Sequence, residues 1–262
     1  MNRNRLVFVA AVLVICIFIV LVVVVLRFVG RRAAPTPPAP PVAGKPGRVL
    51  PGAPGALPAL SVKPQPAEIN FQGCPGEGDN PRQADLNRLK NRVDEGEYVP
   101  VTFDSIANLP WPKSVERLSR DKWPAADEAS VEKYEGVPVS VEGYLAGAKQ
   151  EGPESPNCHG DDAQFRDFHV WLVKNASDDR SRSIVVEVTP RVRANHPNWQ
   201  TDVLGQIVKK DQRVRISGWL MLDPEHPDQV GKTRGTIWEI HPIMQIEVNQ
   251  NGQWTPLDRA GG

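Results

Sequence analysis

The chain has 262 residues with 31 basic and 31 acidic side chains, so its formal net charge is zero. The balance is uneven, because residues 1–70 carry eight basic side chains and one acidic one, whereas residues 71–262 carry 23 basic and 30 acidic ones, a net charge of −7. A globular part this acidic is a poor partner for nucleic acid, whose phosphates supply most of the non-specific affinity. Three cysteines are too few for a disulfide-rich scaffold.

The first predicted element is a transmembrane helix over residues 6–29, which follows a tail of residues 1–5. From Leu6 to Leu26 the sequence contains no charged or strongly polar residue. As a helix with a rise of ~1.5 Å per residue, this run spans about 30 Å of hydrocarbon. It is longer than the apolar region of a typical secretory signal, and arginines follow it where a cleavage site would have small residues. We therefore expect an uncleaved, single-pass signal anchor.

A proline-rich linker, here called the tether, is predicted over residues 30–68. Eleven prolines lie between Ala33 and Pro66, a composition that favours an extended, semi-rigid chain of up to roughly 100 Å over a packed element. Positive charges flank the predicted span on both sides, so the positive-inside rule is close to balanced. The long tether favours a domain held away from the membrane on its outer side, with the N-terminus inside.

Residues 69–136 are predicted to form a helical and irregular addition to the main domain. A helix is expected to begin at Asn80, with a proline at its first position, and to end at Gly96. Its apolar stripe consists of Leu86, Leu89 and Val93. Asp104 is expected to cap a short turn, and residues 111–123 are expected to form irregular structure or short helices anchored by two tryptophans.

Residues 137–257 are predicted to form a mainly β domain, because apolar residues recur there with a period of two. The expected elements are strands at 137–146, 168–173, 183–188, 213–222 and 236–241, the last resuming at 244–248, and a helix at 195–210. A helix between the third and fourth of five strands is the order of the OB-fold, a partly open barrel; a small sandwich is the alternative. Gly143 and Gly218 are expected to be bends or bulges of barrel strands.

This domain contains five distinctive blocks of sequence. They are VEGYL (141–145), DFHVWL (167–172), VVEVTPRVR (185–193), GWLMLDPEHP (218–227) and RGTIWEIHPI (234–243). The blocks resemble an OB-fold-like domain of uncharacterised bacterial proteins that are membrane-anchored or secreted, and WEIHP is the most specific part of the resemblance. The resemblance implies the barrel fold and brings no activity, so it assigns no catalytic residue.

Alternation in the strands places four polar residues on the side of the barrel wall that faces away from the core. They are His169, Glu187, Glu239 and His241. If the faces of the strands coincide, two imidazoles and two carboxylates can bind a divalent metal or act as acid and base. The alternative is that they are ordinary residues of a solvated barrel face, paired with one another across the strands.

Two long connections, residues 147–167 and 223–235, suggest a second candidate site. In an OB-fold these loops flank the binding face. His159, Asp161 and His226 lie in them, and together they offer a metal-binding set. Their spacing matches no specific metal motif, and the polarity of solvated loops explains them equally well.

Cys74 and Cys158 are the two cysteines outside the predicted span. Each lies in a segment rich in turn-forming residues, and an oxidising compartment would keep a bond between them intact. We therefore predict a disulfide between them, with two unrelated thiols as the alternative.

Three functional hypotheses follow from these features. The first is a membrane-tethered, non-enzymatic binding module of the bacterial cell envelope that uses no cofactor and takes a protein, glycan or small molecule. The second is a metal-assisted hydrolase that uses the His/Glu face of the barrel. The third is binding of single-stranded nucleic acid, which the net charge disfavours, although basic residues cluster locally: Arg191, Arg193, Lys209, Lys210, Arg213 and Arg215. Glycine-rich phosphate loops, nucleophile elbows and HExxH motifs are absent from the sequence.

Overall fold

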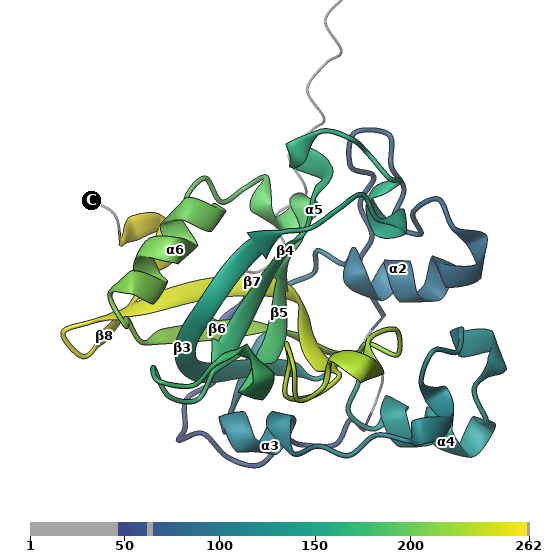
Figure 1. Ribbon diagram of the computed structural model, residues 1–262, viewed down its shortest axis with the longest axis horizontal. Helices are drawn as coiled ribbons and strands as arrows, with labels where there is room; N and C mark the ends of the chain where they lie inside the picture. The colour runs from purple at the N-terminus through teal and green to yellow at the C-terminus, as the bar shows by residue number, and fades with distance from the viewer. Residues whose placement is uncertain (1–46, 62–64, 261–262) are drawn as a thin grey trace, which may run out of the picture. The chain divides into compact units, whose positions relative to one another are not determined.

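A computed structural model describes residues 47–61 and 65–260, and a five-stranded β-barrel forms the centre of this domain (Figure 1). Its strands are β3 (Pro138–Gln150), β4 (Phe168–Val173), β5 (Ile184–Val188), β6 (Val214–Leu222) and β7 (Trp238–Gln250). The ring closes in the order β3–β4–β5–β7–β6–β3, and only the β5–β7 pairing among these is parallel. The prediction of a mainly β domain with a five-stranded barrel is confirmed, and the closed ring excludes a sandwich.

The expected strand positions agree with the structure better than the expected strand ends. β4 occupies the predicted residues, whereas β3 and β7 run further, to Gln150 and Gln250. Helix α6 (Thr201–Lys209) lies between β5 and β6 as expected, and a short helix α5 (Pro190–Arg193) precedes it. In Figure 1, α6 lies on the opposite side of the barrel from helix α2 (Ala84–Lys90).

One side of each barrel strand fills the interior. The inward residues that alternation predicts in three strands are at most 2% exposed: Phe168, Val170, Leu172, Ile184, Val186, Val188, Trp238 and Ile240. Leu204 and Ile207 of α6 join the same core. Because full burial of each large apolar side chain contributes roughly 1.5–3 kcal/mol, this interior dominates the stability of the domain.

Strands β3 and β6 bend at the two glycines that were expected to be bends or bulges. Gly143 is the last β3 residue to pair with β6, and Tyr144 is the first to pair with β4. The register of β6 against β7 shifts at Gly218. A Cβ atom would collide with the carbonyl oxygen of Val173 at Gly143, and with that of Pro242 at Gly218. Both positions therefore need glycine for close approach of two backbones.

Replacing Gly218 by alanine is expected to lower the free energy of unfolding by about 1–3 kcal/mol, because the backbone of β7 must shift to make room. The control is Gly205→Ala in α6, where no atom lies within 4 Å of the added Cβ. Since alanine favours helix over glycine by up to about 1 kcal/mol, the control should be neutral or stabilising. Urea unfolding followed by tryptophan fluorescence compares them, and equal stability of the two variants would contradict the argument.

The region before the barrel contains more regular structure than expected. Besides α2 it holds β2 (Glu97–Val101), α3 (Phe103–Ala107) and α4 (Ala125–Glu132), and β2 pairs in parallel with β3. At the other end, β8 (Gln253–Pro256) pairs with β7. Short 3-10 helices lie at Pro81–Gln83, Lys113–Val115, Arg120–Lys122, Ser155–Asn157, Ala163–Phe165, Arg180–Arg182, Pro227–Gln229 and Leu257–Arg259. Two of them fall in the stretch 111–123, as predicted.

Three of the predicted helix limits are wrong, and one of them is the start of α6, which begins at Thr201 rather than at residue 195. Helix α2 ends at Lys90 rather than at Gly96, because the next residue, Asn91, leaves the helical conformation and its side chain bonds carbonyl oxygens of two other segments. The N-cap of α3 is Thr102, whose hydroxyl accepts a backbone hydrogen bond, and Asp104 lies in the first turn instead. Threonine and aspartate can both cap a helix, so the sequence alone does not decide between Thr102 and Asp104. Thr102 is the cap because the chain enters the helix there.

The described part of the predicted tether packs against the domain. Residues Arg48–Val49 form β1, which pairs in parallel with β2, and Leu57 and Leu60 pack on the core. The prediction of an extended tether over residues 30–68 is therefore wrong for 48–60, because the apolar residues between the prolines find partners on the domain. The part of the tether before residue 47 lies outside the described residues.

The predicted membrane span cannot be compared with this structure. Residues 1–5 and 6–29 lie outside the described residues. Within the part that is described, none of the helices has the length and apolar character needed to cross a membrane. The anchor therefore stays a prediction.

Candidate functional site

The four polar residues predicted to share one side of the barrel wall lie on one face. His169 pairs with Glu187 across β4 and β5. The parallel pairing of β5 with β7 puts Glu187, Glu239 and His241 on the same side, since side chains alternate along each strand. This face is not solvated: Glu239 and His241 are each 1% exposed and Glu187 is 3% exposed. The expectation of a solvated wall is wrong because α2 packs against β7 and covers it.

A pocket of about 300 Å³ lies between this face of the barrel and helix α2. His169 and Glu187 line it from the wall, and Lys90 lines it from α2. The two long connections contribute Glu154, Glu225 and His226. Burial opposes the charge on Lys90, but the carboxylates of Glu154 and Glu187 outweigh burial and raise its pKa. Ionised groups of both signs therefore surround a small hollow.

The wall residues form a chain of ion pairs. His169 Nε2 lies 2.7 Å from Glu187 Oε1, and His241 Nδ1 lies 3.3 Å from Glu187 Oε2 and 3.6 Å from Glu239 Oε2. Burial disfavours all these charges, but the opposite charges outweigh it. They hold the pKa of Glu187 well below its usual range, and they raise the pKa of His169 to about 9 and that of His241 to about 10. Both imidazoles are therefore protonated at neutral pH in this arrangement.

A second group of buried charges adjoins the first through Glu239. Arg234 Nη1 lies 2.6 Å from Glu239 Oε1 and 2.8 Å from Asp223 Oδ2. Asp223 Oδ2 also lies 2.7 Å from Nδ1 of His226. Burial opposes ionisation of Asp223, but the bond to His226 and the charge on Arg234 hold its pKa below the usual range. The wall and the connection 223–235 thus share one charge network.

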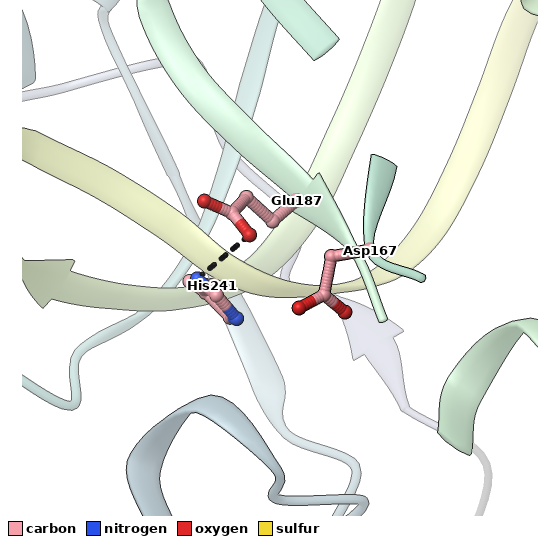
Figure 2. Close-up of side chains that lie close together, drawn as sticks. All are labelled: Asp167, Glu187 and His241. Atoms are coloured by element: carbon pink, nitrogen blue, oxygen red, sulfur yellow. Dashed lines mark ion pairs between the residues drawn. The ribbon is translucent and has the colours of Figure 1, made fainter. Parts of the chain in front are cut away.

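Asp167, which directly precedes β4, completes the site. It offers a carboxylate oxygen that lies, with one ligand atom each of Glu187 and His241, in a group whose atoms are all within 4.8 Å of one another. Figure 2 shows these three side chains together. Asp167 is 2% exposed, and burial and the charges of Glu154 and Glu187 raise its pKa to about 7. Two carboxylates and one imidazole are a set that can hold a divalent metal ion.

No protein-family model matches the sequence, and no curated protein matches it at a significant level of similarity. The resemblance to an OB-fold-like domain of bacterial envelope proteins therefore stays a prediction. Functional conclusions for this chain rest on the geometry of the site.

The three residues of the predicted loop site are not brought together. His159 and His226 both line the pocket, but the side chain of Asp161 is 99% exposed. Each loop histidine has a carboxylate partner of its own: Asp79 Oδ2 lies 2.7 Å from Nδ1 of His159, and Asp223 binds His226. The loop histidines therefore belong to the rim of the pocket, and Asp161 points to solvent.

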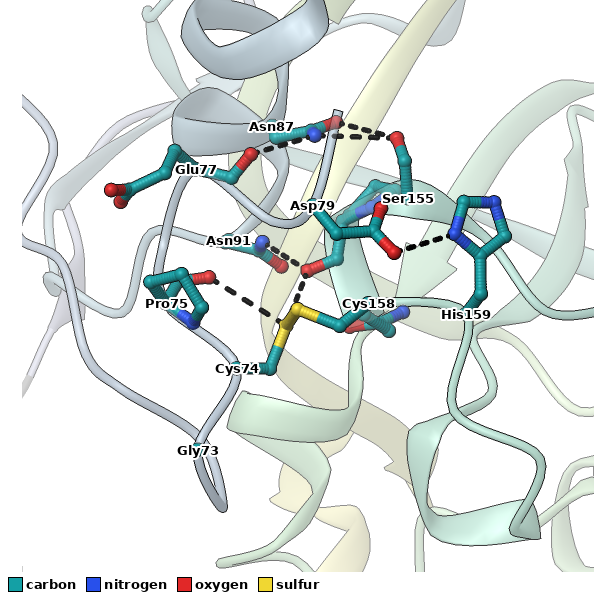
Figure 3. Close-up of a disulfide and its surroundings, with 12 residues drawn as sticks. Gly73, Cys74, Pro75, Glu77, Asp79, Asn87, Asn91, Ser155, Cys158 and His159 are labelled. Carbon is teal, nitrogen blue, oxygen red and sulfur yellow. Dashed lines mark hydrogen bonds and ion pairs between the residues drawn. A yellow bond between two sulfur atoms is a disulfide. The ribbon is translucent and has the colours of Figure 1, made fainter. Parts of the chain in front are cut away.

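The structure contains the predicted disulfide between Cys74 and Cys158, with Cα atoms 5.8 Å apart (Figure 3). The bond joins the segment before α2 to the connection 147–167. Beside it, Asn91 Nδ2 donates a hydrogen bond of 2.7 Å to the carbonyl oxygen of Pro156. The disulfide and this hydrogen bond link the segments on either side of α2 to the connection 147–167, which lines the pocket.

The six basic residues considered for nucleic-acid binding do not form one free surface. Arg191 and Arg193 are 3% and 9% exposed, and Arg191 donates to the carbonyl oxygens of Cys74 and Pro75. Arg213 and Arg215 are paired with Glu142 and Glu247. Lys209 and Lys210 lie at the end of α6. Four of the six are thus engaged within the domain.

Proposed function

We propose that the chain is a binding module of the bacterial cell envelope that takes a small polar ligand into the pocket under α2. The observation that carries this proposal is the lining of the pocket, where the buried Lys90 and Glu187 and the half-buried Glu154 bring charges of both signs to a hollow of about 300 Å³. That volume suits a metabolite or a monosaccharide better than a protein surface. Charges act strongly where water is excluded, so a ligand with complementary polar groups gains both affinity and specificity there.

The placement in the envelope and the type of barrel are parts of the same proposal. We interpret the barrel as OB-like, a fold in which the two connections that line this pocket flank the binding face. Residues 6–29 would anchor the chain in the cytoplasmic membrane, with the barrel outside. A disulfide between Cys74 and Cys158 supports this side of the membrane, because a reducing cytoplasm keeps thiols free.

A larger cleft of about 750 Å³ lies beside the pocket, between α2 and residues 117–122. Its lining includes Arg117, whose side chain is 63% exposed and paired with Asp228. Charges in such a setting are screened by solvent, and they confer little specificity. We therefore place the function in the smaller pocket and regard the cleft as its approach.

Thermal unfolding of the purified full-length chain, with a panel of amino acids, dicarboxylates and monosaccharides, tests the proposal. At least one compound class should raise the melting temperature, as any ligand of the folded state does. Replacing His159 and His226 together by alanine should weaken that compound's binding about tenfold or more, because both line the rim. The control is His196→Ala, a histidine paired with Asp258 away from the pocket. No shift with any compound, or equal shifts in all variants, would refute the proposal.

Metal-assisted hydrolysis is the second candidate function, and the convergence of Asp167, Glu187 and His241 favours it. An ion held there would border the pocket and could activate a water molecule against a bound ester, amide or phosphate. This candidate predicts turnover of a substrate of one of these classes that is lost in Asp167→Asn. The binding-module proposal predicts binding without turnover.

A further inference from the structure

Unpartnered buried atoms gather at one point of the site. Among the described residues, ten buried side-chain nitrogen or oxygen atoms have no hydrogen-bond partner, and four of the ten belong to Asp167, Glu187 and His241. They are Asp167 Oδ1, Glu187 Oε2 and both ring nitrogens of His241. His241 Nδ1 makes ion-pair contacts of 3.3 Å with Glu187 Oε2 and 3.6 Å with Glu239 Oε2, but neither contact is a hydrogen bond. Leaving a buried polar atom unpaired costs about 1–3 kcal/mol. One carboxylate oxygen of each acid and one ring nitrogen of His241 lie close enough to share a single missing partner, so they indicate one absent group rather than separate defects.

The remaining carboxylate oxygens of this group are held in place. Glu187 Oε1 lies 2.7 Å from His169 Nε2. Asp167 Oδ2 accepts a hydrogen bond of 3.0 Å from Asn157 Nδ2, and Asn157 Oδ1 accepts one of 3.0 Å from Arg191 Nη1. Outer partners of this kind orient the ligands of protein metal sites. Each carboxylate is therefore fixed by one oxygen, and its other oxygen makes no hydrogen bond.

We propose that Asp167, Glu187 and His241 bind one divalent transition-metal ion beside the pocket, whose lining includes Glu187. One nitrogen and two carboxylate oxygens suit Zn²⁺ and Mn²⁺ better than soft ions, and two negative charges match the charge of such an ion. At ligand distances of ~2.0–2.2 Å, each of the three donor atoms needs to move inward by less than about 1 Å. The ion takes the place of the imidazole proton, as metals generally do on binding.

Neighbouring side chains of the wall are not ligands in this assignment, because His169 and Glu239 each have a close partner and neither belongs to the converging group. His169 has its two ring nitrogens 3.3 Å from Glu151 and 2.7 Å from Glu187. Glu239 is bound by Arg234 at 2.6 Å. The assignment therefore predicts one imidazole in the coordination shell. It rests on the proposed pocket and deepens it, since Glu187 lines the pocket and would bring the ion within reach of a polar ligand bound there.

Metal titration of the full-length chain, purified in detergent and stripped with a chelator, tests the inference. The wild-type chain should bind one equivalent of Zn²⁺ by calorimetry and elemental analysis. Asp167→Asn and His241→Gln should each raise the dissociation constant by more than about 100-fold, a larger loss than that seen for outer-shell changes. The control is Asp161→Asn, an exposed carboxylate 6 positions along the chain, which should bind as the wild type does.

X-ray absorption of the Zn²⁺-loaded wild type gives a result that does not depend on whether the variants fold. It should show a shell of oxygen ligands with a single imidazole. Absence of bound Zn²⁺ and Mn²⁺ in the wild type, two imidazoles in the shell, or undiminished binding by a folded Asp167→Asn chain would each overturn the assignment.

The compound panel, repeated on chain with and without Zn²⁺, separates this inference from the proposed function. Binding of Zn²⁺ with no response to any compound would leave the metal site standing and refute the small-ligand proposal. A response to a compound in a chain that binds neither metal would do the reverse.

Discussion

Replacing Arg234 by methionine is expected to lower the free energy of unfolding by about 3–5 kcal/mol, because it removes the buried cation that two buried carboxylates share. Arg234 is 1% exposed, and one of its nitrogens binds both Asp223 and Glu239, which are 3% and 1% exposed. Methionine keeps most of the apolar packing of the side chain, so the loss measures the charge network. Urea unfolding followed by tryptophan fluorescence gives the value.

The matched control for Arg234 is Arg213→Met. Arg213 binds Glu142 at 2.7 Å, but its side chain is 52% exposed, so its removal should cost less than about 1 kcal/mol. Adding Glu239→Gln to Arg234→Met should restore part of the lost stability, since one unpaired charge disappears. A loss below 1 kcal/mol for Arg234→Met would mean that water reaches these carboxylates in solution.

Removing the disulfide by replacing both Cys74 and Cys158 with alanine is expected to cost roughly 4–5 kcal/mol. The bond closes a loop with a sequence separation of 84 residues, and loss of that constraint raises the entropy of the unfolded chain by this amount in the chain-entropy model. Urea unfolding with and without reductant measures it. The wild type should lose stability in reductant, and the double variant should not respond.

Cys16→Ala is the control for the disulfide variant, because the structure's disulfide leaves only this third cysteine of the sequence. It should leave the stability of the domain unchanged. In denatured, non-reduced wild type from envelope fractions, thiol titration should find one free thiol per chain. Three free thiols would contradict both the bond and the proposed placement outside the cytoplasm.

The barrel could be predicted because its signal is local. In β4 and β5, alternate residues point to opposite sides, so a run such as Phe168, Val170 and Leu172 reveals both a strand and its buried face. Helix α6 shows its own period in Val203, Leu204 and Ile207. These patterns depend on residues close together in the chain, and the structure preserves them.

The cover over the barrel wall could not be predicted because it depends on segments far apart in the chain. The sequence pattern of a histidine and a glutamate on the outer side of a strand is the same whether water or α2 covers them. β2 was missed because Pro100 lies within it, and a proline inside an apolar run argues against a strand. Asp167 shares the side of His169 in the sequence pattern, but acidic residues before strands are usually solvated, so only its burial reveals its role.

The packing of residues 48–60 along the domain changes how far the proposed anchor lets the pocket travel. With the chain fixed from β1 onwards, at most residues 30–46 are left for the proposed tether, which would reach at most about 60 Å even when fully extended. The tether as first predicted would reach about 100 Å. Because accessible volume scales with the cube of reach, the pocket explores a space about four to five times smaller. A ligand presented at the membrane surface then meets the pocket at a correspondingly higher effective concentration.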